Sequence, residues 1–466
     1  MKICLINPPS PSGYVANRGF MGDFGMLHFP GGTILPPHNL LLLSAFIKDY
    51  AEIYFIDAVA LQKDAKYVLG DVCRYNPDAI FMNTSTPTAE SDFLLSAQLK
   101  EYLRSKIIFM GPHAVYTADE VFQKSKADCI LIDNVPEVAQ KLVHMLEEKN
   151  LAFLPGTYIK VGNQIQGERL NGFGIENFPF PEWNIAPLNK YFYLYRRELP
   201  YATMVSSIGC LFRCRFCPYP VAANFRYAEM SPGRVLSEIK FLKGIGIKMI
   251  LFRDALFTAN KKRIESICNL LEKEKIDIIW RCETSAECVD EFLLSKMAGA
   301  GCRGINFGIE SIDSRVVSDM NCEAKRKDIR KVREVFKKCK SLGIETFAFF
   351  ISGLPDDDRD TIKRNVDFAI GLEPDHVQFT YAVPFPGTDL YKISIEENLL
   401  VNRLWENFSS LEPVSSTRFL SVEEVRSLNK WAYRRFFLRP RRIFKELLYP
   451  ARFFRRAITY LSWLRR

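Results

Sequence analysis

Short apolar runs recur along the first 150 residues, and apolar residues return at helical spacing in the stretches between them. The runs fit buried strands, and a stretch such as 89–104 fits a helix. Alternating strands and helices predict a parallel sheet wrapped by helices, which is a Rossmann-like α/β domain over 1–150. The strands predicted for this domain are 3–6, 52–57, 79–84, 106–111 and 129–132.

Glycine and proline interrupt this rhythm in residues 151–200. Both residue types favour turns and loops over regular elements. The segment is therefore predicted to be a linker, with a small hairpin around 158–165.

From residue 201 the alternation resumes with six strand–helix units. Six such units predict a complete or partial TIM-type β/α barrel over 201–390, and barrel enzymes place their chemistry at the carboxyl ends of the strands. A helical carboxyl-terminal region is predicted over 391–466. The predicted barrel strands are 202–207, 248–254, 276–283, 303–310, 346–353 and 376–383, and helices are predicted at 232–243, 260–274, 290–299, 325–342 and 358–371.

Size and composition agree with several domains. A chain of 466 residues exceeds one ordinary core, and a hydrophobic content of 48% is sufficient for burial. The first apolar run ends in prolines, which fits a strand better than a signal peptide. No apolar stretch reaches about 18 residues, the length that a spanning helix needs, so a cytoplasmic protein is expected.

The net charge of +9 belongs to the tail. From Arg434 onward eleven residues are arginine or lysine and one, Glu446, is acidic, so the rest of the chain is close to neutral. Apolar residues recur among these arginines at helical spacing. The tail is therefore interpreted as a helix docked on the barrel, or as an amphipathic helix on an anionic inner membrane surface with Tyr460 and Trp463 at the interface. RNA binding is the least favoured interpretation.

Three of the twelve cysteines form a cluster. Cys210, Cys214 and Cys217 make a C-x3-C-x2-C run after the first predicted barrel strand, while the other nine are scattered and fit buried thiols. Three thiolates in one loop suit an iron–sulfur cluster or zinc. A structural zinc site usually needs a fourth ligand, and the chain has no second CxxC pair. Three ligands would leave one iron open for a small molecule.

With Phe216 before the third cysteine, this segment resembles the signature of the radical S-adenosylmethionine (SAM) superfamily. The resemblance implies a [4Fe–4S] cluster on the three cysteines, with SAM chelating the open iron. It also implies a 5′-deoxyadenosyl radical, formed when an electron from the cluster cleaves the sulfonium. A donor such as flavodoxin or ferredoxin would supply that electron.

Further motifs extend the resemblance over 203–388. They are FRDALFT (252–258), GINFGIES (304–311), FFISGLPDDD (349–358) and PFPGTDLY (384–391). The resemblance places Asp254 near the SAM amino group or the substrate, Glu310 near the ribose, and Ile351 and Gly353 near the adenine. Relatives often carry an arginine within the stretch that reads RCETSAE here. Ser285 stands in its place, so Arg281 is an alternative source of that contact.

The amino-terminal domain resembles the cobalamin-binding subgroup of the same superfamily, through KICLINPP, 110–122 and 128–137. Ligands of such sheets lie at the carboxyl ends of the strands. The candidate cobalamin contacts lie in the loops 7–13, 84–88 and 111–115 and are Pro9, Ser85, Gly111 and His113.

Two features of this domain depart from the subgroup. The chain has no D-x-H-x-x-G string, which leaves His113 as the candidate lower cobalt ligand, with a hydrogen-bonding or surface histidine as the alternative. Residues 134–137 read NVPE where relatives often have Gly-Glu-x-Glu. A degenerate or purely structural domain is therefore the alternative to cobalamin binding.

Together these features predict a radical SAM enzyme, favoured as a cobalamin-dependent methyltransferase acting on an unactivated carbon of a small-molecule or lipid-like substrate. Radical oxidation, cyclisation or rearrangement without methyl transfer is the alternative. A noncatalytic metal-cluster protein is more distant, because it leaves the ordered barrel motifs unexplained. A tRNA methylthiotransferase is disfavoured, because Cys4, Cys73 and Cys129 are too widely spaced for a second cluster.

Overall fold

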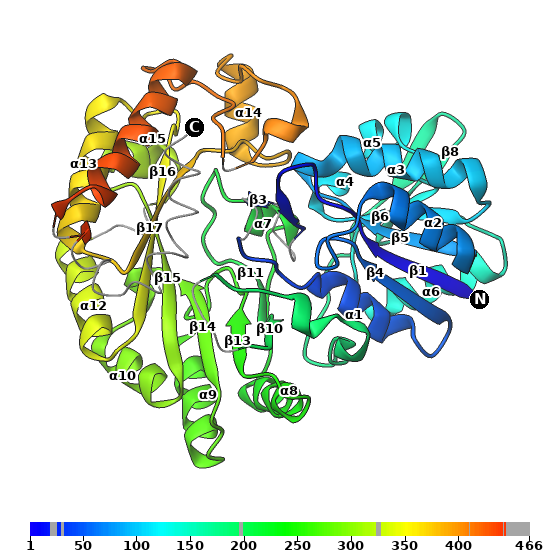
Figure 1. The fold of residues 1–466 in the computed structure, drawn as a ribbon, viewed down its shortest axis with the longest axis horizontal. Coiled ribbons are helices and arrows are strands. Elements are labelled where there is room, and N and C mark those ends of the chain that lie inside the picture. Colours follow the sequence, from blue (N-terminus) through cyan, green and yellow to red (C-terminus); the bar gives the residue numbers. More distant parts are fainter. Residues whose placement is uncertain are drawn as a thin grey trace.

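A computed structural model describes residues 1–18, 26–28, 32–194, 199–322, 328–409, 411–440 and 442–443. Two α/β domains lie side by side, the amino-terminal one in blue and cyan and the second in green to orange (Figure 1). Most of the basic tail, including Tyr460 and Trp463, lies outside the described residues. Its interpretations stay predictions.

The amino-terminal domain is a seven-stranded sheet in the order β4-β1-β5-β6-β7-β8-β9. Alternate strand residues pack under α1 and α6 on one face and under α2, α3 and α5 on the other. Burial on both faces explains the nearly continuous apolar strand sequences. The parallel strands are β4 (Glu52–Asp57), β1 (Lys2–Asn7), β5 (Ala79–Asn83), β6 (Lys106–Met110) and β7 (Cys129–Leu131), and the helices are α1 (His38–Ile47), α2 (Ala65–Tyr75), α3 (Ala89–Tyr102), α5 (Ala118–Lys124) and α6 (Pro136–Glu147).

The hairpin predicted around 158–165 is present, but it is not part of a free linker. Its strands β8 (Thr157–Val161) and β9 (Gln164–Gly167) extend the sheet, because β8 pairs antiparallel with β7. The amino-terminal sheet therefore continues past the boundary predicted at residue 150.

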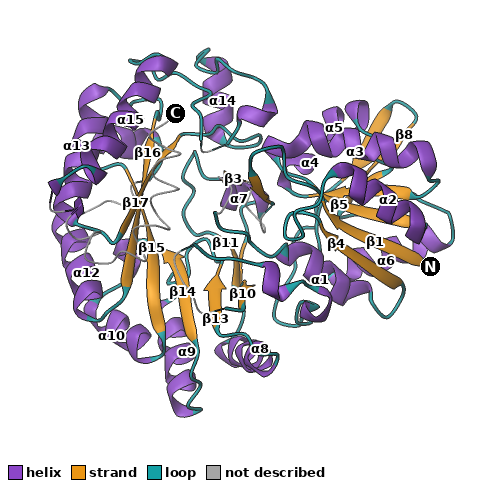
Figure 2. Ribbon diagram, viewed as in Figure 1, coloured by secondary structure: helices purple, strands orange, loops and turns teal. Residues whose placement is uncertain are grey.

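The second domain is a six-stranded parallel sheet in the sequential order β10-β13-β14-β15-β16-β17. Helices cover its outer side, as Figure 2 shows. Among the described strands β10 and β17 do not pair with each other, so the sheet is an open, partial barrel. The strands are β10 (Tyr201–Met204), β13 (Met249–Phe252), β14 (Ile279–Thr284), β15 (Cys302–Glu310), β16 (Glu345–Ser352) and β17 (His376–Tyr381), and the outer helices are α8 (Pro232–Gly244), α9 (Lys261–Lys273), α10 (Glu291–Gly299), α12 (Ile329–Ser341) and α13 (Arg359–Leu372).

Alternation along these strands separates the core from the site. Phe252, Trp280 and Phe350 belong to the core under the helices. Because strand side chains alternate, their neighbours Arg253, Arg281 and Ile351 face the inner side of the sheet. The inner side therefore carries polar side chains such as Arg253 and Arg281.

The carboxyl-terminal region is only partly helical. After α14 (Asp389–Glu396) the chain is mostly irregular until α15 (Val422–Phe437), which packs on α13 and β17. In the part of the chain that the structure describes, no helix has both the length and the apolar character needed to span a membrane.

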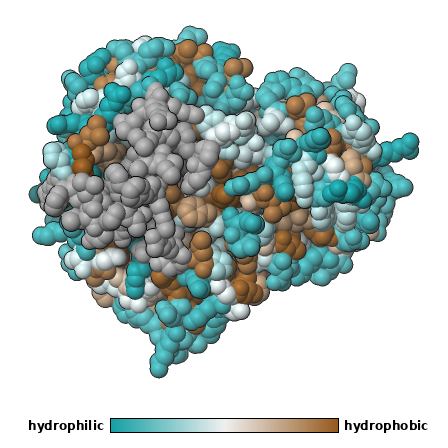
Figure 3. Space-filling model, viewed as in Figure 1, coloured by the Kyte–Doolittle hydropathy of each residue, from teal (hydrophilic) through white to brown (hydrophobic). Residues whose placement is uncertain are grey.

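Buried polar contacts fasten the two domains to each other. Tyr201 Oη donates to the carbonyl oxygen of Ile34, and Tyr191 Oη donates to Asp57 at 2.9 Å. Apolar side chains gather where the domains meet, on the face drawn in Figure 3, while the rims are mostly hydrophilic. The carboxyl end of β4, at Asp57, and the amino end of β10, at Tyr201, therefore both lie at the interface between the domains.

Candidate active site

The three clustered cysteines lie on a loop that leaves a short hairpin. The structure inserts β11 (Ser207–Gly209) between the first barrel strand and Cys210, and β11 pairs antiparallel with β12 (Tyr227–Glu229). The loop ends at α7 (Pro218–Ala222). Cys214 is buried, and Cys210 and Cys217 are half-buried.

Backbone hydrogen bonds hold this loop to two other parts of the barrel. Arg215 N–H donates to Met320 O at 3.0 Å, just after α11 (Ser314–Asp319). Leu390 N–H, in the first turn of α14, donates to Arg215 O at 2.9 Å. The loop is thus anchored beside the segments that follow β15 and β17.

An apolar cluster surrounds the inner side of the loop. Cys214 packs with buried Met320, Leu354 and Leu390, and the partly buried members include Phe216 and Ile351. The structure therefore brings two residues of the predicted SAM site, Phe216 and Ile351, against the cysteines. Such surroundings exclude water and strengthen electrostatic interactions.

The donor set fits an iron–sulfur cluster. Thiolates are the ligands of such clusters, and these three thiols share one anchored loop. Within the described residues, no three His, Cys, Asp or Glu side chains already surround a common metal position. Cys210, Cys214 and Cys217 are the residues that would hold an iron–sulfur cluster.

Asp254 follows β13 and supports the hairpin that carries the loop. Its carboxylate is fully buried and accepts hydrogen bonds from Ser206 N–H at 2.8 Å, Ser206 Oγ at 2.6 Å and Ser207 Oγ at 2.7 Å. Burial raises the pKa of Asp254. The carboxylate positions the start of β11, and a direct contact with SAM stays a prediction.

Glu310 and Gly353 stand at strand ends in uncommon backbone conformations. Glu310 has a φ of 60° and follows a register shift between β15 and β16. Gly353 has a φ of 91°, and a Cβ there would lie 3.0 Å from Val425 Cγ1. Left-handed conformations at strand ends are a common feature of functional sites.

Asp357 fixes the turn that follows β16. Its buried carboxylate accepts from Gly353 N–H at 2.9 Å, Leu354 N–H at 3.0 Å and Thr361 Oγ1 at 3.0 Å. Burial raises the pKa of Asp357 to about 7. Sequence reasoning quoted this residue only as part of a motif and missed its role.

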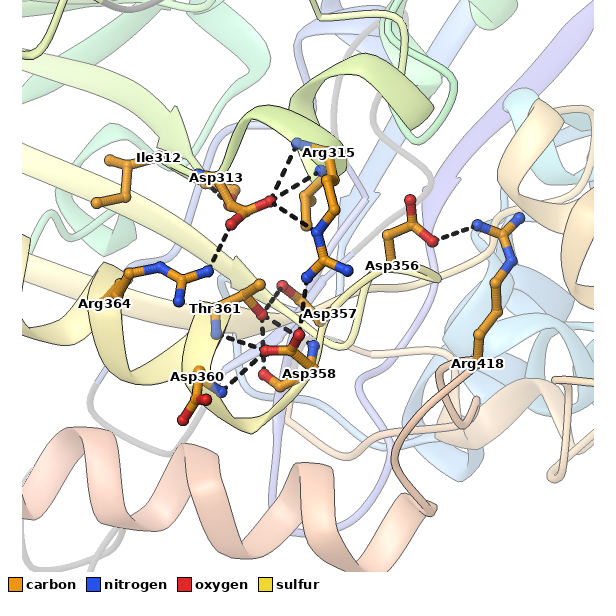
Figure 4. Close-up of polar contacts among 12 residues, drawn as sticks. Ile312, Asp313, Arg315, Asp356, Asp357, Asp358, Asp360, Thr361, Arg364 and Arg418 are labelled. Atoms are coloured by element: carbon orange, nitrogen blue, oxygen red, sulfur yellow. Dashed lines mark hydrogen bonds and ion pairs between the residues drawn. The ribbon is translucent and has the colours of Figure 1, made fainter.

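Ion pairs brace the outside of the same turn, as Figure 4 shows. They join the loops that follow β15 and β16 to each other and to the carboxyl-terminal segment. The pairs are Arg315–Asp358 at 2.7 Å, Arg364–Asp313 at 2.6 Å and Arg418–Asp356 at 2.6 Å.

Arg253 and Glu283 form an ion pair on the inner side of the barrel. Arg253 Nη1 donates to Glu283 Oε1 at 2.5 Å, and Arg253 Nη2 donates to Tyr219 Oη at 3.3 Å. Tyr219 belongs to α7, directly after the cysteine loop. Arg253 and Glu283 are therefore closer to the cysteines than Arg281, and sequence reasoning did not single them out.

Arg281 lies in the barrel away from the cysteine loop, and its predicted contact with SAM stays a prediction. It is fully buried in the lower half of the barrel, where Arg281 Nη1 donates to Glu345 Oε2 at 2.8 Å. Glu345 begins β16 and also contacts His376 Nε2 at 2.9 Å. Arg281 thus faces the amino ends of the strands, away from the turn at Gly353.

At the carboxyl edge of the amino-terminal sheet, an unforeseen arginine joins two of the predicted cobalamin loops. Arg18 Nη1 donates to Pro8 O at 2.6 Å, Arg18 Nη2 donates to Pro9 O at 3.1 Å, and Arg18 pairs with Asp92 at 2.7 Å. Both side chains are only 1% exposed.

Asp92 extends this network to the loop after β5. Its carboxylate accepts from Thr84 Oγ1 at 2.8 Å and Thr88 Oγ1 at 2.7 Å, and Thr88 Oγ1 lies 2.8 Å from Ser85 Oγ. The network therefore brings the loops of Pro9 and Ser85 together. It could not be predicted from the sequence, because its members are far apart along the chain.

Gly111 and His113 have structural surroundings. Gly111 has a φ of 114°, and a Cβ there would lie 2.4 Å from Thr84 O, so this glycine permits one loop to pass close to another. His113 is fully buried in α4 (Pro112–Tyr116) and is not the loop residue expected. Burial lowers its pKa to about 3.

The His113 ring is enclosed. Its Nδ1 lies 3.2 Å from Thr86 Oγ1, and its ring centroid lies 5.2 Å from that of Trp405. Within the part of the chain that the structure describes, its Nε2 has no hydrogen-bond partner. The ring therefore has the surroundings of a core residue, and the role of His113 as a cobalt ligand stays a prediction.

Comparison with known proteins agrees with this geometry. The Radical SAM superfamily matches residues 204–369. An uncharacterised methyltransferase of Pyrococcus horikoshii is 27% identical over 454 residues, which cover 96% of this chain and 95% of that protein.

Two solved structures share the fold. The radical SAM methyltransferase TsrM from Kitasatospora setae, with cobalamin and a [4Fe–4S] cluster bound, matches with a TM-score of 0.69 at 16% identity, over 86% of this chain and 76% of that one. The cobalamin-dependent SAM radical enzyme OxsB, with aqua-cobalamin and SAM bound, matches with a TM-score of 0.73 at 16% identity, over 99% of this chain and 72% of that one. This chain therefore carries a radical SAM domain, and its fold resembles that of those two structures over most of the chain.

Proposed function

We propose that the protein is a radical SAM enzyme that uses cobalamin to transfer a methyl group to an unactivated carbon of a small molecule. One observation carries this proposal: the edge of the amino-terminal sheet touches the element that follows the cysteine loop. Tyr116 Oη, in α4, donates to Val221 O, in α7, at 2.5 Å. A corrin at the first edge and a cluster at the second would face one shared reaction space.

The cofactors would supply the radical and methyl-transfer chemistry, and the protein would position them. Cys210, Cys214 and Cys217 would hold the cluster. Glu310, Ile351 and Gly353 would surround the nucleoside of SAM.

The supporting network has a separate task. Asp357 fixes the turn at Gly353, and Arg18 fixes the loop at Pro9. Apolar residues around Cys214 keep water from the cluster, which protects a radical from side reactions.

The similar proteins support methyl transfer. Both the Pyrococcus protein and TsrM are described as methyltransferases, and TsrM binds cobalamin as well as a [4Fe–4S] cluster. A radical oxidation, cyclisation or rearrangement is the second candidate. It is favoured by the anaerobic magnesium-protoporphyrin IX monomethyl ester cyclase of Rubrivivax gelatinosus, which is 22% identical to this chain over 86% of this chain and 74% of that protein.

The proposal requires a one-electron reductant. The proposal also includes two features that the sequence predicts. They are a lipid-like substrate and contact between the basic tail and a membrane surface.

The test is anaerobic reconstitution of the full chain with iron, sulfide and cobalamin. After reduction with dithionite, the protein is expected to convert SAM to 5′-deoxyadenosine and to retain a corrin absorbance through gel filtration. Transfer of a labelled SAM methyl group into a product separates the two candidates. Failure to form 5′-deoxyadenosine would contradict both.

A further inference from the structure

The outer side of the cysteine loop is a surface of large apolar and cationic side chains. Leu211 is 58% exposed and Phe225 is 49% exposed. Arg213 and Arg215 are exposed between the cysteines. These four residues are called the loop patch.

The hairpin places the two apolar members together. Its last pair is Gly209 with Tyr227, and Leu211 and Phe225 each lie two residues beyond that pair, on the two chains that leave it. The apolar parts of the patch therefore belong to one small area, directly over the loop that would carry the cluster.

The backbone holds Phe225 outward at a conformational cost. Asn224 has a φ of 51° and Phe225 a φ of 56°, a region that bulky residues seldom adopt. Phe225 N–H donates to Pro220 O at 2.6 Å, and the Arg213 guanidinium lies 5.5 Å from the Phe225 ring centre. An exposed aromatic ring that is held so firmly is suited to contact with a partner.

The charge of the patch is positive. The loop 210–217 contains two arginines and no acidic residue. Arg215 lies 3.7 Å from Asp319, and Asp319 also pairs with Arg418 at 3.0 Å. Arginines around exposed aromatic and aliphatic anchors are typical of protein interfaces, whereas lysine is depleted there.

We propose that the loop patch docks an acidic one-electron carrier protein, which reduces the cluster. The inference rests on the proposed function, because it presumes a [4Fe–4S] cluster on this loop. In the step, the carrier's reduced flavin or iron–sulfur centre loses one electron and the cluster gains it. Leu211 and Phe225 provide the apolar contact, and the two arginines attract the carrier's acidic rim.

Another exposed aromatic residue provides a matched control. Phe292, in α10, is 58% exposed and follows Asp290 and Glu291, which pair with Lys261 at 2.7 Å and with Lys338 at 3.4 Å. It lies on an outer helix of the barrel, away from the cysteine loop.

The experiment compares reductants on the reconstituted full chain. The variants are Leu211→Glu, Phe225→Glu, Arg213→Glu and the control Phe292→Glu. Stopped-flow absorbance follows reduction of the cluster by photoreduced flavodoxin, by reduced ferredoxin and by dithionite, at low and high salt.

The first three variants are expected to be reduced by at least one of the two proteins about tenfold more slowly than the wild type, while dithionite reduces them at the wild-type rate. Salt is expected to slow reduction of the wild type by that protein. Phe292→Glu is expected to match the wild type throughout.

Wild-type rates with both proteins in all three patch variants would overturn the inference. Loss of dithionite reduction in all three would also overturn it, because the patch would then support the cluster itself. Absence of 5′-deoxyadenosine from dithionite-reduced wild type is a different result, which contradicts the proposed function.

Discussion

The two sheet edges that meet at the interface are built in different ways. At the barrel edge, the candidate site residues belong to short sequence motifs. The cysteine loop, the turn at Gly353 and Glu310 each lie at the end of a strand or within a few residues of it. At the amino-terminal edge, the loops are joined by Arg18 and Asp92, which are 74 residues apart in sequence. Local motifs therefore identify the edge proposed for the cluster, whereas long-range polar contacts join the loops of the edge proposed for the corrin.

Removing the cluster ligands should break the barrel edge and leave the other edge intact. Replacing any one of Cys210, Cys214 and Cys217 by alanine is expected to abolish 5′-deoxyadenosine formation, because the cluster loses one of its three thiolates. Corrin retention should persist. Iron analysis, product chromatography and the corrin spectrum measure these results.

Cys322→Ala is the control, since Cys322 is buried in the same apolar cluster but lies outside the motif. Equal iron loss from this variant would show that packing, and not ligation, explains the effect.

Replacing the buried ion pair should break the amino-terminal edge in turn. Arg18→Met alone leaves Asp92 buried without its partner, and it is expected to reduce the free energy of unfolding by about 3–5 kcal/mol. The double variant Arg18→Met/Asp92→Leu should regain stability but release the loops of Pro9 and Ser85. Its cobalamin affinity should be about tenfold weaker, because the loops lose their fixed geometry.

The pair Arg234–Glu238, at 2.9 Å with side chains 11% and 2% exposed, offers a matched control in α8. Arg234→Met/Glu238→Leu should leave cobalamin affinity unchanged. Wild-type cobalamin binding by the Arg18 double variant would show that the network serves stability alone.

The difference between the two edges also decides how much of each could be predicted from the sequence. Both sheets, their helices and the cysteine loop could be predicted, because apolar periodicity and the spacing of Cys210, Cys214 and Cys217 are local. The sequence predicts the hairpin at 158–165 but places it in a linker, because the residues of the hairpin do not show that β8 pairs with β7. Arg18, Asp92 and Arg253 were missed because a buried charge resembles a surface charge until its partner is known.

His113 and Arg281 show what residue type and motif leave open. Both residue types can bind a ligand, and both stand near strands that the motifs identify. His113 packs under Trp405, and Arg281 pairs with Glu345. Only the direction of the side chain decides between a ligand and a core residue.

A substitution in the turn after β16 is expected to have a smaller effect at the barrel edge. Asp357→Ala leaves the N–H groups of Gly353 and Leu354 without their acceptor, which should cost about 1–3 kcal/mol of unfolding free energy and weaken SAM binding. Asp357→Asn keeps an acceptor oxygen and should cost less. Denaturant unfolding and SAM titration measure the two variants.

The same carboxyl makes stability depend on pH. Burial raises its pKa from 3.8 to about 7, so the folded state holds its proton more tightly than the unfolded chain does. The contribution of Asp357 is present below pH 3.8 and is lost as the pH rises toward 7. Asp357→Asn should remove this decline, and an unchanged pH profile would show that Asp357 is ionised in the folded state.

The smallest effect is expected from His113. His113→Phe keeps the contact with Trp405 and loses the one with Thr86, so a cost of about 1 kcal/mol is expected with an unchanged corrin spectrum. A spectral shift on this substitution would identify His113 as a cobalt ligand.

The central claim is that one chain holds both cofactors at one interface. Metal analysis of gel-filtered, anaerobically reconstituted protein tests it most directly. The account predicts the iron of one [4Fe–4S] cluster together with one cobalt atom in each chain. Protein that retains iron but no cobalt after reconstitution with cobalamin would contradict it.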